Sequence, residues 1–520
     1  MRILLRSGKA PETVLGPEAS LARNKSGVFG ANVGNFLFSH AVHELLSRPG
    51  VEVVPDSMSL EQPGISDAHI ASINEEFDAL VLPLANAFRP SFLPWLDRLT
   101  RVVSKAEIPV SVVGVGAQLP YSGDFSVRND KLDASVKAFC NAVLERSPSI
   151  GVRGEITASY LKALGYGDSE VEIIGCPSMF VHGPHHTVER SHTQLTAESA
   201  VALNVTPSVP GMGGFLSRAL AEYKNSEIVL QEFRELELLL WGTPVPGYPA
   251  DLPGRLEHPA YQQGALRFFL DTRTWFSYMR DHEFATGNRI HGTIAALSAG
   301  TPGVLLSHDS RTRELAEYHG IPYVSAVDAD IDTLRISDLW DRCDLTTLNE
   351  LAPKNFERFS HFLHNHNLSH IYDEGQANSE YASLLDSTVY PEPVRPLSGN
   401  NTQQLASRLQ WLRQGIPGDQ ERSYGAYRLP FAPETHQVRS NRELIREQKK
   451  QLDTLANRST RFERENRLLE QRLRAAEALL AEHQSHFNYI RRPIGEKLKR
   501  AIAARAGRFF QGGEHRTHEG

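Results

Sequence analysis

Short apolar runs and longer amphipathic stretches alternate along most of the chain. The runs are rich in Val, Ile and Leu, which is typical of buried strands, whereas apolar residues spaced three to four apart are typical of helices. We predict strands at 1–5, 51–54, 77–84, 109–115, 150–153, 171–174, 200–205, 227–230 and 303–307. Helices are predicted at 35–46, 91–106, 134–147 and 155–164 and within 264–280.

This alternation predicts the fold class. Strand, helix and strand repeated in order favour parallel sheets covered by helices on both faces. A polar, histidine-rich interval at 182–198 interrupts the order before it resumes. We therefore predict an α/β protein with two Rossmann-like, doubly wound lobes, 1–185 and 199–386, which face a cleft. Ligands of open α/β sheets bind beyond the carboxyl ends of the strands, so polar segments that follow strands are the candidate site residues.

The composition changes after residue 386. Residues 387–437 are rich in Pro, Gly, Asn and Ser, which is typical of a linker. At 438–486 Glu, Arg, Gln and Leu dominate, and a heptad of mixed quality predicts a C-terminal coiled-coil helix. Asn466 at a core position of this heptad favours a two-stranded register and therefore a homodimer. The alternative is a single amphipathic helix packed on the lobes.

The segment 489–510 is strongly basic. It carries seven basic residues and one acidic residue, and Ile494, Leu498 and Ile502 recur every four positions. This pattern predicts a basic amphipathic helix in peripheral contact with an anionic membrane surface. The alternative is a tail that is only solvated.

Composition narrows the class of protein further. With 520 residues and 40% hydrophobic content, the chain can form two or three domains with substantial cores. A net charge of −7 gives no reason to expect nucleic acid as a partner. Cys140, Cys176 and Cys343 are odd in number and widely spaced, so they indicate neither a disulfide framework nor a metal site. No apolar run is long enough to span a membrane, and we expect a cytoplasmic enzyme.

One segment carries candidate chemistry by itself. Residues 287–302 read GNRIHGTIAALSAGTP, and the small apolar residues predict a helix that opens near Gly292. The first N–H groups of a helix lack partners, so beside Arg289 and His291 they form a seat for phosphate or carboxylate. The alternative is that Arg289 pairs with a carboxylate of the core and His291 caps the helix.

Five other segments accompany this one in an order and spacing that resemble the polysaccharide pyruvyl transferase family. They are 30–35 (GANVGN), 113–118 (VGVGAQ), 151–155 (GVRGE), 175–178 (GCPS) and 309–311 (DSR). The resemblance covers roughly residues 25–325. Two segments depart from the family pattern: Gly34-Asn35 replaces the usual Gly-Asp, and 82–87 stands where many relatives carry a glycine-rich turn.

The resemblance implies a glycosyltransferase-B-like pair of lobes and a defined reaction. The family transfers the enolpyruvyl unit of phosphoenolpyruvate onto two hydroxyls of a sugar, which forms a pyruvate ketal and releases phosphate without a cofactor or a metal. The donor is a compact trianion, and we expect Arg153 and Arg289 to bind it because guanidinium groups bind carboxylate and phosphate bidentately. Backbone N–H groups around Gly292 are expected to add to the phosphate seat.

A general acid must protonate the methylene carbon of the donor. His291 is the candidate because a neighbouring phosphate favours its charged form. The base is left open among the departing phosphate, Asp309, and His291 after it has donated its proton. Asp309 and Arg311 are expected to support the site, or to pair with each other at the start of the next helix.

The acceptor is expected to be a saccharide, either free or linked to a nucleotide or a lipid. The resemblance implies that the first lobe is the acceptor side and the second the donor side, with Asn32, Gly34, Asn35 and Gln118 as the acceptor contacts. Asn and Gln suit sugar hydroxyls because their side-chain amides donate and accept hydrogen bonds at once. This interpretation implies an enzyme of cell-surface or exopolysaccharide biosynthesis, at the inner face of the membrane if the basic tail binds there. The alternatives are a nucleotide-sugar-dependent glycosyltransferase of two-lobed fold and a non-catalytic scaffold of a polysaccharide-synthesis complex.

Overall fold

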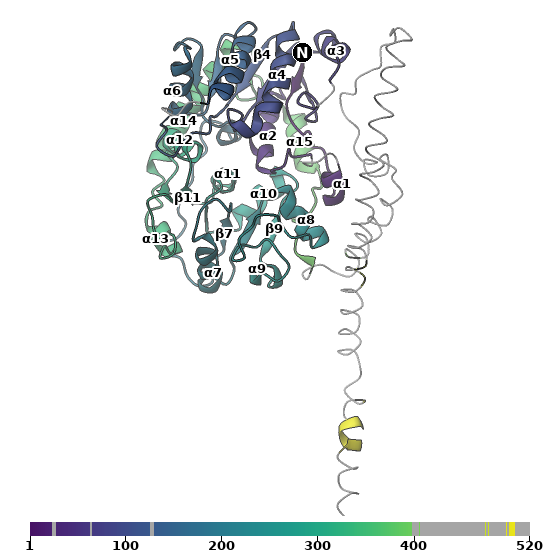
Figure 1. Cartoon of the computed structure of the whole chain (residues 1–520), viewed down its shortest axis with the longest axis vertical. Helices are drawn as coiled ribbons and strands as arrows, with labels where there is room; N and C mark the ends of the chain where they lie inside the picture. The colour runs from purple at the N-terminus through teal and green to yellow at the C-terminus, as the bar shows by residue number, and fades with distance from the viewer. Residues whose placement is uncertain are drawn as a thin grey trace, which may run out of the picture. The chain divides into compact units, whose positions relative to one another are not determined.

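The computed structural model describes residues 1–22, 28–62, 65–124 and 129–397, together with 405, 474, 477, 496 and 499–504. One compact unit comprises Met1–His436 and a second comprises Gln437–Gly520. The predicted coiled coil at 438–486, the basic tail at 489–510 and the linker beyond 397 lie almost wholly outside the described residues, and they stay predictions. Both predicted lobes belong to the first unit (Figure 1).

The first lobe is built on a parallel sheet with the strand order β2-β1-β3-β4. Its strands are β1 (Arg2–Leu5), β2 (Glu52–Pro55), β3 (Ala79–Pro83) and β4 (Val110–Val113). The next two strands, β5 (Ile150–Val152) and β6 (Val171–Ile173), pair with each other, and a bridge between Val115 and Val152 joins them to the sheet. Every residue of β3 and β4 is buried, as expected for central strands covered on both faces.

Helices cover this sheet. They are α2 (Gly34–Leu46), α3 (Asp67–Glu76), α4 (Leu93–Lys105), α5 (Asp130–Leu144) and α6 (Glu155–Leu164), with short 3₁₀ turns η1 (Pro90–Phe92) and η2 (Pro177–Phe180). Helix α1 (Pro17–Ala22) instead packs on the second lobe. In α4 the apolar side chains at Leu96, Leu99 and Val103 share one face and are fully buried, and α4 packs on α5. This spacing is why the sequence predicts the helix.

The second lobe has a six-stranded parallel sheet with the order β12-β11-β10-β7-β8-β9. Its strands are β7 (Val201–Asn204), β8 (Glu227–Leu230), β9 (Leu266–Phe268), β10 (Phe284–Gly287), β11 (Gly303–Ser307) and β12 (Tyr323–Ser325). Its helices are α7 (Met212–Glu222), α8 (Phe233–Trp241), α9 (Pro259–Gln262), α10 (Thr272–Arg280), α11 (Ile290–Ala299), α12 (Ser310–His319) and α13 (Ile336–Asp341). The expected α/β class with two parallel sheets is therefore confirmed.

Helix α2 joins the two lobes. Phe36 and Leu37 pack into the core of the second lobe, whereas Val42 and Leu45 pack with the strands of the first. Figure 1 shows α2 at the level where the two lobes meet. Because both faces of the helix are buried, its N-terminal end is held firmly between the sheets.

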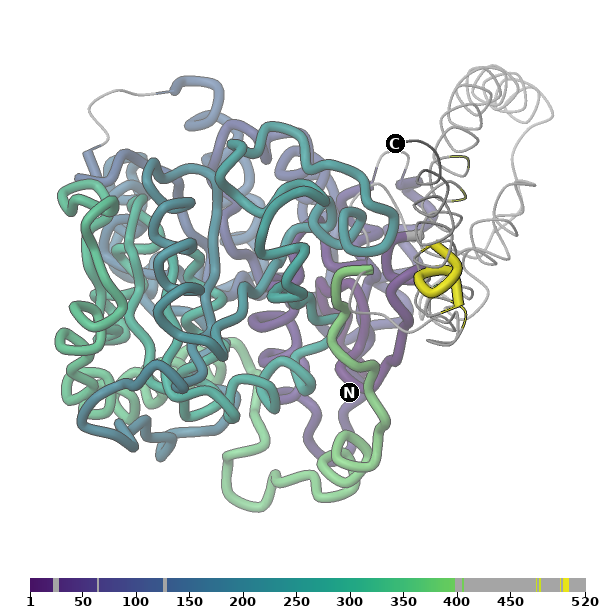
Figure 2. The backbone as a smooth tube through the Cα atoms, turned by 90° about the horizontal axis from the view of Figure 1, so that it is seen from below, coloured from purple at the N-terminus to yellow at the C-terminus, as the bar shows by residue number. Residues whose placement is uncertain are grey.

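The last two helices of the unit, α14 (Thr346–Asn365) and α15 (Ser379–Ser387), correct the predicted lobe boundary. The prediction assigned all of 199–386 to the second lobe. Instead, Phe356, Phe359 and Phe362 of α14 pack against the sheet of the first lobe. Tyr381 in α15 donates a hydrogen bond to Glu12 at 2.8 Å, and Figure 2 shows this segment alongside the N-terminal part of the chain. The phenylalanine face of α14 is apolar enough to cover a sheet, and the sheet it covers lies far away in the sequence.

No helix among the described residues combines the length and the apolar composition that a membrane span requires.

Candidate functional site

The carboxyl ends of both sheets open onto one cavity of about 710 Å³. Arg6, Asn86, Arg89, Gln118 and Arg153 reach it from loops that follow strands of the first lobe. Segments that follow β7, β8, β10 and β11 line it from the second lobe. This is where ligands bind in open α/β folds, so the topology brings sequence-distant residues together.

Most of the predicted site residues meet in this cavity. Those that line it are Asn32, Asn35, Gln118, Arg153, Arg289, His291, Asp309 and Arg311. Gly34 and Gly292 are not among the lining residues, but both allow close packing around it. A Cβ atom at Gly34 would lie 2.6 Å from His291 Nδ1, and one at Gly292 would lie 2.6 Å from the Asn204 side-chain nitrogen. Both glycines are therefore needed for space.

Arg153 follows β5 and is only 2% exposed. Its Nε donates to the carbonyl of Gly114 at 2.8 Å, which fixes the guanidinium plane. Its Nη2 has no hydrogen-bond partner, and no ion pair joins Arg153 to a carboxylate among the described residues. Burial lowers the pKa of this guanidinium below its ordinary value. The side chain is thus a buried cation with an unused donor.

Arg289 stands at the N-cap of α11 and has opposite surroundings. Its Nη1 lies 2.7 Å from Glu232 Oε1, its Nη2 lies 3.8 Å from Glu235, and its Nε donates to the carbonyl of Val205. Burial alone would lower its pKa, but Glu235 and Glu232 raise it above the ordinary value. The structure therefore contains the pairing with core carboxylates that was the alternative interpretation of this residue.

His291 lies in the first turn of α11, and its Nε2 is buried without a partner among the described residues. Burial, followed by the charges of Arg153, Arg311 and Arg289, lowers the pKa of His291 to about 3. The imidazole is therefore neutral at physiological pH when no anion occupies the cavity. A bound anion beside it would act in the opposite direction.

The start of α11 corrects one expectation. The helix begins at Ile290 and not near Gly292. The N–H of Gly292 already donates to the carbonyl of Arg289 at 3.0 Å, so it is not available to an anion. The earlier start places His291 inside the first turn, and Ile290 and His291 line the cavity.

Asp309 is the N-cap of α12, where both of its carboxylate oxygens are engaged. One accepts from the N–H of Thr312 at 2.9 Å, and the other accepts from Nε of Arg311 at 2.9 Å. Although burial works in the opposite direction, Arg311 lowers the pKa of Asp309 below its ordinary value. The expectation that Asp309 and Arg311 pair with each other at the helix start is thus met.

Two asparagines of the 30–35 segment use their amides within the protein. The Asn32 amide donates to Glu232 Oε1 at 2.8 Å, and its backbone forms a bridge with the same residue across the lobe boundary. The Asn35 amide donates to the carbonyl of Phe29 at 2.9 Å. Part of the hydrogen-bonding capacity expected to meet a sugar is therefore used within the protein.

Sequence reasoning missed several polar residues of the cavity, among them Asn86, Arg89 and Glu232. Asn86 and Arg89 follow β3, and Glu232 follows β8. Each comes within a few residues of the carboxyl end of a predicted strand, which is a signal that could have found them. They belong to no motif of their own, so nothing else in the sequence distinguishes them.

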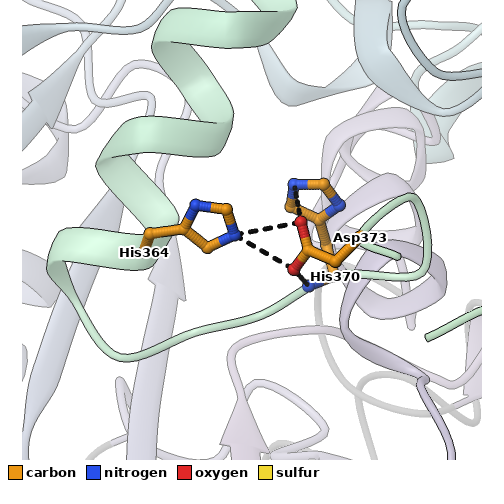
Figure 3. A group of neighbouring side chains, drawn as sticks. All are labelled: His364, His370 and Asp373. Carbon is orange, nitrogen blue, oxygen red and sulfur yellow. Dashed lines mark hydrogen bonds and ion pairs between the residues drawn. The ribbon is translucent and has the colours of Figure 1, made fainter. Parts of the chain in front are cut away.

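A separate group of possible metal ligands lies outside the residues that line the cavity (Figure 3). The ligand atoms of His364, His370 and Asp373 are within 4.8 Å of one another. However, Nδ1 of His370 accepts from the backbone N–H of Tyr372 at 3.2 Å, so Nε2 carries the proton of the neutral ring. That Nε2 then donates to Ser360 at 2.7 Å and is not free to bind a metal. We interpret the group as the hydrogen-bonded turn that follows α14.

Residues 32–310 match the family model described as polysaccharide pyruvyl transferase. No curated protein matches the chain. Among solved structures, the Staphylococcus aureus MnaA–UDP structure is 13% identical, covers 75% of this chain and 99% of its own, and has a TM-score of 0.34. A Neisseria meningitidis UDP-GlcNAc 2-epimerase bound to UDP-GlcNAc is 11% identical and covers 74% and 99%, with a TM-score of 0.34. Anabaena Alr3699/HepE in complex with UDP and glucose is 12% identical and covers 74% and 99%, with a TM-score of 0.33.

Proposed function

The chain belongs to the polysaccharide pyruvyl transferase family, and from this membership we propose that it transfers the enolpyruvyl unit of phosphoenolpyruvate onto two hydroxyls of a saccharide. The products are a cyclic pyruvate ketal and phosphate. The reaction would serve cell-surface or exopolysaccharide biosynthesis in the cytoplasm, with a homodimeric coiled coil and a membrane-binding tail as further proposals.

The observation that carries this proposal is the state of Arg153. This guanidinium is 2% exposed, its Nη2 donor is unused, and it lacks a carboxylate partner among the described residues. Burying a charge in such surroundings costs free energy. An anionic ligand in the cavity would supply the missing partner. Phosphoenolpyruvate offers both a carboxylate and a phosphate, and guanidinium groups bind either one bidentately.

Arg153 would carry the larger share of donor binding. Arg289 has its charge offset by Glu232 and Glu235, so it would contribute one shared contact and hold Glu232 in place. The charge of Arg311 also acts on His291, although Asp309 offsets part of it. The donor would therefore lie at Arg153, next to the imidazole.

His291 would act as the general acid only after the donor has bound. In the unliganded cavity its pKa of about 3 keeps it neutral. The trianion reverses the sign of the local field, raises this pKa and lets Nε2 take up a proton. His291 would then give this proton to the methylene carbon, which becomes the methyl group, while C2 becomes oxocarbenium-like and accepts the first sugar hydroxyl.

Glu232 is the best candidate for the base. Its side chain is 36% exposed and lines the cavity, whereas both oxygens of Asp309 are engaged by Thr312 and Arg311. Glu232 would take the proton of the first hydroxyl as that oxygen bonds to C2. The second hydroxyl would then replace the phosphate on the same carbon, and its proton would leave with the phosphate. His291 and Glu232 would return to their starting states by proton exchange with water.

The experiment that tests this function compares the intact chain with Arg153→Gln and His291→Asn. Phosphoenolpyruvate at a hundredfold excess over its Kd should stabilise the wild-type chain by about 2.7 kcal/mol in thermal unfolding. Arg153→Gln should lose this stabilisation. His291→Asn should keep it but release phosphate ~10²–10⁴-fold more slowly when saccharide acceptors are added, because a general acid is missing.

Arg234→Gln is the matched control, since this exposed arginine on α8 does not line the cavity. It should behave like the wild type in both measurements. If nucleotide sugars stabilise the wild-type chain and phosphoenolpyruvate does not, the proposed function is wrong and glycosyl transfer takes its place.

A further inference from the structure

One more arginine of the cavity, Arg89, is not used by the proposed donor seat. Arg89 stands in the loop after β3, at the N-cap of η1, and lines the cavity. Its Nε is buried without a hydrogen-bond partner, and no ion pair joins it to a carboxylate among the residues that the structure describes. Its guanidinium therefore keeps an unused donor and contacts no carboxylate among these residues.

Arg89 and Arg311 meet at one neutral side chain. With the amide oxygen of Asn86 turned toward them, that oxygen accepts from Arg89 Nη1 at 2.9 Å and from Arg311 Nη1 at 3.0 Å. Two guanidinium groups thus converge on a group that has no charge. Burial, and next the charge of Arg311, lower the pKa of Arg89. Asp309 forms an ion pair with Arg311, whereas Glu232 acts to raise the pKa of Arg89 without forming an ion pair with it, so Arg89 keeps an unused donor.

Aromatic side chains lie directly beside this pair. The rings of Phe92 and Trp95 stack with centroids 5.7 Å apart and planes 24° apart, and both residues line the cavity. The Arg89 guanidinium lies 5.9 Å from the Phe92 ring centroid. Trp95 is 37% exposed, which is unusual for so large an apolar side chain. An exposed aromatic face next to two guanidinium groups suits a ligand with one flat apolar face and one anionic group.

We propose that Arg89, Asn86 and Arg311 form a second anion subsite, which binds a phosphoryl group carried by the acceptor saccharide while Trp95 contacts its ring. The inference rests on the proposed function and makes it narrower: the acceptor is a phosphoryl-linked saccharide and not a free sugar. A cavity of about 710 Å³ can enclose a drug-sized ligand, so a compact donor at Arg153 leaves room for it. The linked group can be a nucleotide or a lipid, and the chemistry at Arg89 is the same for both.

Titration calorimetry of the intact chain with inorganic pyrophosphate, in the presence of saturating phosphoenolpyruvate, tests the subsite. With the donor seat filled, pyrophosphate should still bind the wild-type chain. Arg89→Gln should weaken this binding roughly tenfold to a hundredfold, since a charge-assisted hydrogen bond is lost. The same variant should bind phosphoenolpyruvate within about twofold of wild type, and Arg234→Gln should change neither affinity. Arg89→Lys, which keeps the charge, should recover part of the loss and show that the fold is intact.

A second series identifies the acceptor. Glucose 1-phosphate should bind more tightly than glucose, and Trp95→Ala should weaken glucose 1-phosphate but leave pyrophosphate unchanged. Binding of UDP-glucose points to a nucleotide-linked acceptor, and binding of farnesyl diphosphate points to a lipid-linked one. Either result supports the subsite.

Three results would overturn the inference. The first is a wild-type chain that binds no pyrophosphate once phosphoenolpyruvate is saturating. The second is an Arg89→Gln variant that loses phosphoenolpyruvate as strongly as Arg153→Gln does, because Arg89 would then belong to the donor seat. The third is pyrophosphate binding without a response to any phosphoryl-linked compound. If phosphoenolpyruvate itself does not bind, the proposed function fails, and pyrophosphate titration without it still reports on Arg89.

Discussion

The two walls of the cavity each contribute one buried arginine, and the two arginines have opposite electrostatic surroundings. On the first-lobe wall, Arg153 has no ion-pair partner among the described residues, and its Nη2 is unused. On the second-lobe wall, Arg289 contacts Glu232 and Glu235 and donates to the carbonyl of Val205. Both lie after a strand of a parallel sheet, so their position in the fold does not explain the difference.

The difference separates two uses of the same residue type. A buried cation that is already paired belongs to the folding of the protein, because its removal leaves carboxylates behind. A buried cation that is unpaired destabilises the empty protein and is relieved by an anionic ligand. Arg289 is therefore expected to position its neighbours, and Arg153 to bind the donor.

The largest expected effect that tests this comparison is on stability. Arg289→Gln should lower the free energy of unfolding by about 3–5 kcal/mol, since it leaves Glu235, which is 0% exposed, without its cation. Arg153→Gln should leave the free energy of unfolding unchanged or raise it, because it removes an unpaired buried charge. Urea unfolding of both variants without ligand measures the two values.

The double variant Arg289→Gln with Glu235→Gln is the control. It should recover much of the stability lost in the single variant, since the unpaired carboxylate is gone. Equal losses in Arg153→Gln and Arg289→Gln would contradict the comparison, because the two arginines would then be equally integrated in the fold.

The sequence could predict much of the framework but not this difference. Apolar runs such as ALVLP at β3 and GVLLS at β11 are buried at every position and are recognisable from composition alone. The segment around Arg289 and His291 was correctly placed at a helix start that follows a strand. The carboxylate nearest to Arg289 is 57 residues away in the chain, so no local spacing reveals the pairing.

The same reason accounts for what was missed elsewhere. Arg89 belongs to no recognisable motif, and its importance depends on Arg311, which reaches the same amide from the other lobe. The packing of α14 depends on a sheet built from the first third of the chain. Local patterns define elements, whereas the partners of a charge or an apolar face depend on contacts that only the folded chain makes.

The next prediction concerns the proton linked to donor binding. Arg153 and Arg311 lower the pKa of His291 in the empty cavity, so a bound trianion should raise it and cause proton uptake. Calorimetry of phosphoenolpyruvate binding at pH 6, in buffers of different ionisation enthalpy, should show that the wild-type chain takes up more protons than His291→Asn, by up to about one proton. The donor titrates in the same range, so the difference between the two proteins is the informative quantity. Identical proton uptake in both proteins would show that the bound donor does not change the pKa of His291.

The smallest expected effect is on stability in acid, and it compares the two arginines a second time. The pKa of His291 in the folded chain is about 3, below its ordinary value of about 6.5. Below pH 6.5 the unfolded chain therefore binds a proton that the folded chain cannot, and this lowers the free energy of unfolding as the pH falls toward 3. His291→Asn removes this contribution. Between pH 8 and pH 5, the free energy of unfolding should therefore fall by about 1–2 kcal/mol less in this variant than in wild type.

The exposed His361→Asn variant is the matched control for this measurement and should show no such gain. His319 should preserve part of the acid sensitivity in every variant, because its buried Nε2 accepts the N–H of Cys176 and its pKa is also about 3. Among the charges on His291, that of Arg153 lowers its pKa more than that of Arg289 does. Arg153→Gln should therefore reproduce more of the gain in unfolding free energy at pH 5 than Arg289→Gln does, because two carboxylates offset the charge of Arg289. The opposite ranking would mean that the paired arginine, and not the unpaired one, governs the electrostatics of the cavity.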